Sequence, residues 1–85
     1  MDMLKDKVFA RDIIKQVCKE YQVSYEALTG KNPHLHLRQA RTRAIWRIKQ
    51  ETDFSFSRIA GLFGRDHTTI IHIYRVAEQH NGYYY

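Results

Sequence analysis

The chain has 85 residues, the size of one small domain, and a formal net charge of +5. Hydrophobic residues make up 44% of it, enough to build a core, so intrinsic disorder is not expected. A single cysteine excludes an internal disulfide, and no apolar run approaches the roughly 20 residues of a membrane span. We therefore expect one domain over residues 1–85 of a cytoplasmic protein that does not associate with membranes.

The first third of the chain predicts one long and one short helix. Apolar residues spaced three and four apart indicate an amphipathic helix over residues 7–21. Its apolar positions are Val8, Phe9, Ile13, Ile14, Val17, Cys18 and Tyr21. Ser24 is a suitable N-cap for a short helix that ends near Leu28. A loop over residues 29–33 follows, because Pro33 cannot continue a helix.

The rest of the chain predicts three further helices. A second long helix runs to about Thr52, and its apolar positions are Leu37, Ala40, Ala44, Ile45 and Ile48. Ser55 can cap a helix that ends at Gly64. The last helix begins near Asp66, and its apolar side is formed by Ile70, Ile73, Tyr74 and Ala77. Residues 81–85 are expected to form a poorly ordered tail. No strand pattern is present, so the fold class is all-α, with four or five helices.

The segment from about residue 55 to 80 has the outline of a helix-turn-helix, a unit whose second helix enters the major groove of DNA. This second helix opens with short polar side chains. His67 can donate a hydrogen bond to guanine or thymine, Asp66 can accept one from cytosine, and a threonine methyl can pack on the thymine methyl. The alternative from composition alone is that Asp66 is merely an N-cap and the threonines are solvated, because helix starts favour these residue types.

Three stretches of sequence carry a resemblance to a known family. Residues 59–72 (IAGLFGRDHTTIIH) resemble the signature of the C-terminal DNA-binding domain of the bacterial replication initiator DnaA. Residues 41–46 (RTRAIW) resemble the basic start of the long central helix of that domain, and residues 13–28 resemble its first two helices. The similarity spans roughly residues 12–79. It implies an all-α helix-turn-helix domain, of the general kind found in the Trp repressor, and binding to double-stranded DNA at a DnaA-box-like site.

The resemblance also implies roles for individual residues. The residues expected to read bases in the major groove are Asp66, His67 and Thr68. The family's phosphate contacts match Arg41 and Thr69. We further expect phosphate contacts from Arg43, Arg47, Arg58 and Arg65. Arg65 is also suited to tie the turn between the two helices, and we favour that structural role slightly. The candidates for the family's minor-groove contact are Lys31 and Arg38, although the loop that precedes the long helix lacks the family's run of basic residues. The family usually has two glycines before the signature arginine, and here only Gly64 stands there, which predicts a turn shorter by one residue.

The sequence predicts no enzyme, no cofactor, no metal site and no small-molecule substrate. No Gly-rich phosphate loop with a following lysine occurs, so the chain has no nucleotide-hydrolysis motif. His34 and His36 lack a third metal ligand at a supporting spacing.

The leading hypothesis is a stand-alone, sequence-specific DNA-binding protein that regulates replication or transcription. A phage or mobile-element factor and an excised initiator domain both fit this hypothesis. Two alternatives stay open: a dimeric repressor of the Trp-repressor type, which would need a palindromic site, and a module that binds a protein of the replication machinery.

Overall fold

The computed structural model describes the backbone of residues 3–84 and the side chains of residues 9–84. The described residues form five helices and no strand, which confirms the all-α prediction. The helices are α1 (Met3–Tyr21), α2 (Tyr25–Thr29), α3 (Leu35–Glu51), α4 (Phe56–Phe63) and α5 (His67–Glu78). Within these residues no helix is long and apolar enough to cross a membrane. Of the predicted features, the side chain of Val8 and all of Tyr85 lie outside the described residues.

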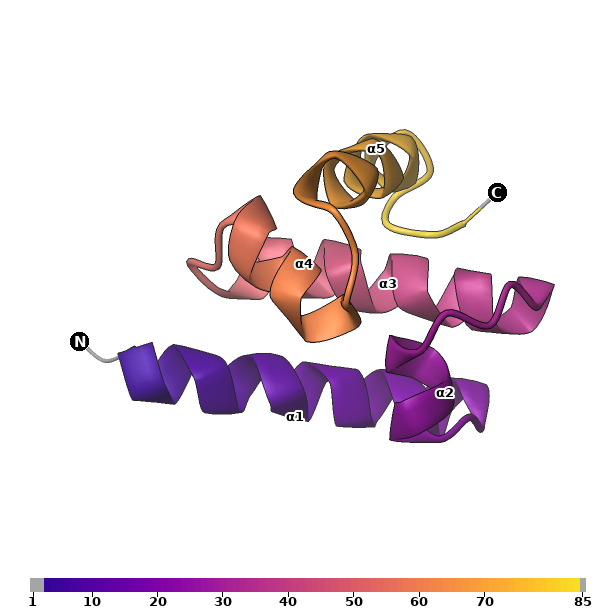
Figure 1. The fold of residues 1–85 in the computed structure, drawn as a ribbon, viewed down its shortest axis with the longest axis horizontal. Helices are drawn as coiled ribbons and strands as arrows, with labels where there is room; N and C mark the ends of the chain where they lie inside the picture. Colours follow the sequence, from indigo (N-terminus) through magenta and orange to yellow (C-terminus); the bar gives the residue numbers. More distant parts are fainter. Residues whose placement is uncertain (1–2, 85) are drawn as a thin grey trace.

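The long helix α3 forms the centre of the fold and packs against all four other helices. Figure 1 shows α1 and α3 side by side and running in opposite directions, with α5 on the side of α3 away from α1. Within the described side chains, the predicted apolar stripe of α1 packs into this core from Ile13 to Tyr21, whereas Phe9 is exposed. The fully buried side chains include Ile13, Ile14, Val17, Leu28, Ile45, Ile48, Phe54, Ile59, Phe63 and Ile70.

The starts of α2 and α4 are fixed locally by serine side chains. The hydroxyl of Ser24 accepts a hydrogen bond from the backbone N–H of Ala27, at 3.0 Å, and begins α2. The hydroxyl of Ser55 accepts from the backbone N–H of Arg58, at 3.2 Å, and begins α4. Both caps match the sequence prediction, and each satisfies one of the backbone donors that a helix start leaves free.

Candidate nucleic-acid interface

The turn between α4 and α5 sets the direction in which α5 leaves. Gly64 has φ +61° and ψ +37°, a left-handed conformation that a glycine adopts without steric cost. The backbone N–H of Arg65 donates to the carbonyl of Ala60 at 3.0 Å and closes the end of α4. Arg65 itself donates from Nη1 to the carbonyl of Phe63, at 3.0 Å, so its side chain contributes to holding the turn. The turn therefore consists of the three residues 64–66.

The first residues of α5 differ from the starts of α2, α3 and α4. Asp66 occupies the N-cap position in an extended conformation, yet its side chain makes no capping hydrogen bond, unlike those at the starts of α2, α3 and α4. Asp66, His67, Thr68 and Thr69 are all exposed, and the buried face of α5 begins only at Ile70. The interpretation of Asp66 as a mere side-chain cap therefore finds no support in the geometry, and its carboxylate is left available to another partner.

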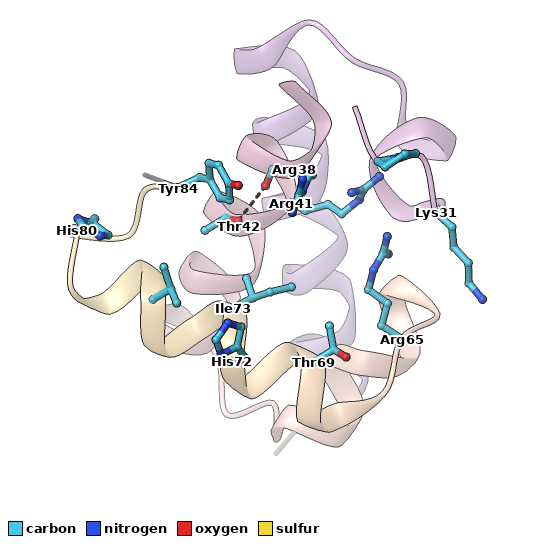
Figure 2. A pocket seen from close by; sticks show the side chains of 12 residues that line it. Lys31, Arg38, Arg41, Thr42, Arg65, Thr69, His72, Ile73, His80 and Tyr84 are labelled. Atoms are coloured by element: carbon cyan, nitrogen blue, oxygen red, sulfur yellow. Dashed lines mark hydrogen bonds between the residues drawn. The ribbon is translucent and has the colours of Figure 1, made fainter. Parts of the chain in front are cut away.

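A cavity of about 670 Å³ opens beside this helix start. Figure 2 shows its cationic wall, to which the loop before α3 contributes Lys31, α3 contributes Arg38 and Arg41, and the turn contributes Arg65. Thr69 lines the cavity from α5, and no acidic residue is among the lining residues. The cavity is thus positively charged and suited to a phosphate group.

Arg41 is the cation that the fold holds most firmly. Only 4% of its surface is exposed. Its Nε donates to the buried carbonyl of Leu28 at 2.8 Å, and its Nη2 donates to the carbonyl of Asn32. Burial, together with repulsion from the nearby charges of Arg65 and Arg38, lowers the pKa of Arg41. Since arginine remains protonated even so, these three like charges repel one another, and an anion in the cavity would relieve that repulsion.

Arg65 and Lys31 extend the cationic wall beyond Arg41 (Figure 2). Figure 2 shows Arg65 reaching from the turn toward Arg41, while the side chain of Lys31 extends away from the protein. Burial lowers the pKa of Arg65 as well. Arg65 thus ties the turn through its bond to Phe63 and also lines the cavity, while its contact with a phosphate stays a prediction.

The three other arginines that we predicted to contact phosphates lie elsewhere and have partners within the chain. Arg43 lies against the C-terminal tail, and its Nη1 is 3.4 Å from the carbonyl oxygens of both Asn81 and Gly82. Arg47 forms an ion pair with Glu51 at 2.8 Å and also donates to Gln16 of α1. The guanidinium of Arg58 lies 4.0 Å from the centre of the Phe54 ring. Their contact with DNA stays a prediction.

Sequence reasoning missed much of the cavity wall. The residues that line it and were not among the predicted site residues are Pro33, Thr42, His72, Ile73, Val76, His80 and Tyr84. The lining residues on α5 could have been predicted from the sequence. His72, Ile73 and Val76 follow Thr69 at intervals of three, four and seven residues, which places them on one face of the helix. Nothing in the sequence indicated Tyr84, because its place depends on how the tail folds back.

The histidines set aside as metal ligands serve local structure. The ring Nδ1 of His34 accepts from the backbone N–H of His36 at the start of α3, and the ring of His36 bonds to the carbonyl of Tyr21 at 2.6 Å. Among the described residues, no group of three or more potential metal ligands occurs.

A short helix, a glycine turn and a second helix with an exposed polar start define this part of the molecule as a helix-turn-helix. Over residues 10–76 the chain matches the family model described as the bacterial dnaA protein helix-turn-helix. The chain therefore belongs to the family of the C-terminal helix-turn-helix domain of DnaA, as its resemblance to that domain predicted.

Individual relatives agree with this assignment. The chain is 39% identical over 62 residues to the chromosomal replication initiator protein DnaA of Bacteroides thetaiotaomicron, an alignment that covers 72% of the chain. It is 34% identical over 67 residues to DnaA 1 of Chlamydia pneumoniae and 32% identical over 71 residues to DnaA of Herpetosiphon aurantiacus, over 79% and 82% of the chain. In these relatives the alignment covers only 13–15% of the length, so the chain spans a small part of the proteins that it matches.

Proposed function

We propose that this chain binds double-stranded DNA in a sequence-specific manner, with α5 in the major groove at a DnaA-box-like site, and that it acts by binding rather than by catalysis. The observation that carries the proposal is the uncapped polar start of α5 beside a cavity lined by four cations. A helix that reads bases needs free side chains at its start, and the phosphates next to the bases it reads need positive charge.

The proposed contacts divide between the two halves of this surface. Asp66, His67 and Thr68 read base edges, since they are exposed at the start of α5, where no side chain makes a capping hydrogen bond. Thr69 lines the cavity next to the arginines, which suits a phosphate contact. Each good base contact favours the correct base over a wrong one by about 1–3 kcal/mol. The phosphate contacts supply most of the affinity and its dependence on salt.

In this proposal the cations that line the cavity contact the phosphates of the DNA backbone. Arg41 and Arg65 are fixed by hydrogen bonds to carbonyl oxygens and present a preorganised charge. Lys31 lies on the loop before α3 and Arg38 on the first turns of α3, both at the rim of the cavity. From there their side chains can contact DNA phosphates on the way to the minor groove. A biological role in regulating replication is supported by the relatives, which are named chromosomal replication initiator proteins. Regulation of transcription is the alternative role, and a phage or mobile-element factor or an excised initiator domain fits either role.

The test is selection of bound duplexes from a random pool, repeated with His67→Ala. We expect the parent protein to enrich one short asymmetric site and His67→Ala to lose preference at one or two positions of that site. The matched control is Gln79→Ala, at the other end of α5, where the exposed side chain does not line the cavity. An unenriched pool, or an enriched site indifferent to His67, would contradict the proposed readout.

The same experiment separates the alternatives. A palindromic site with a symmetric footprint, bound by a dimer in gel filtration, would favour a repressor of the Trp-repressor type. Specific binding to a replication protein that survives His67→Ala, with no enriched DNA, would favour a protein-interaction module.

A further inference from the structure

The last residues of the chain fold back onto α3. Asn81 and Gly82 have positive φ angles of 58° and 89°, which reverse the chain after α5. The backbone N–H of Gly82 donates to the carbonyl of Ala77 at 2.8 Å. We expected a poorly ordered tail here, but Gly82 is buried and the described part of the tail has defined contacts with α3.

The closeness of this contact requires a glycine. A Cβ atom on Gly82 would lie 2.5 Å from two ring atoms of Trp46 and 2.6 Å from Nη1 of Arg43. The guanidinium carbon of Arg43 lies over the ring of Trp46 and over that of Tyr83, at 5.2 and 4.2 Å from their centres. Because Arg43 also donates to two tail carbonyls, it holds the tail against α3.

This docking brings Tyr84 to the edge of the cationic cavity. Tyr84 is half-buried and lines the cavity, and its ring centre lies 5.8 Å from the guanidinium carbon of Arg38. Figure 2 shows the ring beside Arg38 and Thr42, across the cavity from Arg65. Arg38 is exposed, and within the described residues its guanidinium contacts this ring, whereas its backbone carbonyl accepts a hydrogen bond from the hydroxyl of Thr42.

We propose that Tyr84 is a positioning residue of the DNA interface, which holds the guanidinium of Arg38 against the DNA backbone. The proposal rests on the proposed DNA binding and extends it to the tail. The family model ends at residue 76, so this part of the interface lies beyond the region that the chain shares with the model. An aromatic face favours a nearby cation and restricts a flexible arginine, which lowers the entropy that the arginine loses when it binds a phosphate.

The test compares dissociation constants for the duplex selected with the parent protein. Tyr84→Ala should weaken binding about two- to fivefold, the effect of an exposed cation–π contact, and Tyr84→Phe should restore the parent affinity because it keeps the ring. Arg38→Ala should weaken binding and lower the slope of log K against log salt by about 0.9, the value for one phosphate contact. The combined variant should bind no more weakly than Arg38→Ala alone, since Tyr84 acts through Arg38.

Two further variants separate this role from a general one. Tyr25→Ala removes a tyrosine that is 36% exposed and does not line the cavity, and it should leave the affinity unchanged. Gly82→Ala should displace the whole tail and reproduce the effect of Tyr84→Ala on affinity. Thermal unfolding of every variant verifies that binding is compared between folded proteins.

The outcomes distinguish the two proposals. If the parent protein selects no duplex, the proposed function fails, and the role of Tyr84 fails with it. If the parent binds a selected duplex and Tyr84→Ala binds equally well, or if its effect adds to that of Arg38→Ala, only the role of Tyr84 is overturned. Tighter binding by Tyr84→Ala would also overturn it, because the ring would then cover Arg38 instead of presenting it.

Discussion

Arg41 should stabilise the fold as well as bind DNA, and Arg41→Met tests the first of these roles. The substitution keeps most of the buried aliphatic stem and removes the guanidinium. It leaves the carbonyl of Leu28 buried without its donor and takes one donor from the carbonyl of Asn32. A hydrogen bond to a charged group contributes about 1.5–3 kcal/mol, and a buried group left without a partner costs about 1–3 kcal/mol.

The loss is smaller than the sum of these terms. Removing the guanidinium also removes the repulsion from Arg65 and Arg38 that lowers the pKa of Arg41, and it removes the cost of burying a charge. We therefore expect Arg41→Met to lower the free energy of unfolding by about 2 kcal/mol, which in a domain of this size lowers the melting temperature by about 8–16 °C.

Urea denaturation measures this loss directly. The midpoint should fall with little change in the m-value, because the surface exposed on unfolding stays nearly the same. The control is Arg38→Met, one turn earlier on α3, where the side chain is exposed and the change should stay within about 0.5 kcal/mol. If Arg41→Met is as stable as this control, the two bonds to carbonyl oxygens do not stabilise the fold, and the reasoning fails.

Three further predictions concern the helix starts and the core. Ser55→Ala should lower the free energy of unfolding by about 1 kcal/mol, because the Ser55 side chain makes a capping bond. Asp66→Ala should change base preference in duplex selection more than stability, because the Asp66 side chain makes no such bond. Equal losses of stability in urea for the two variants would contradict this. Gly64→Ala should cost about 1–2 kcal/mol through backbone strain alone, since an added Cβ meets no atom within 4 Å, and a crystal structure of the variant should show the same turn. Burial raises the pKa of the Cys18 thiol, so at pH 8 a disulfide reagent should react with it more slowly than with free cysteine, and urea should abolish the difference.

Most of the fold could be predicted because its signals are local. Ser24 and Ser55 stand one residue before the helices that they cap, and the spacing of apolar residues on α3 and α5 identifies their buried sides. Each of these signals acts within a few residues along the chain, which is the range over which periodicity and capping operate. The start of α1 was predicted at residue 7 and lies at Met3, because charged residues there continue a helix without an apolar pattern to mark it.

The candidate site was predictable only in part, because it depends on contacts between distant segments. The motif at the start of α5 is continuous in sequence and could be identified directly. Whether an arginine of α3 faces the cavity, α1 or the tail depends on what packs beside it, and Arg41, Arg47 and Arg43 illustrate the three cases. Tyr84 reaches the cavity only because a glycine two residues earlier fits against Trp46.

The position of α3 places the residues proposed to read bases and those proposed to contact the DNA backbone on one surface. α3 packs against α5, so the exposed first turn of α5 is held at a fixed place relative to Arg38 and Arg41. Arg41 in turn bonds to Leu28 and Asn32, and thereby holds the loop that carries Lys31. Base-reading residues discriminate only if the backbone contacts set the register of the protein on the duplex. A change in the packing of α3 against α5 should therefore reduce both the affinity for DNA and the selectivity between sites. Loss of Lys31 or Arg38 at the rim of the cavity should reduce the affinity alone.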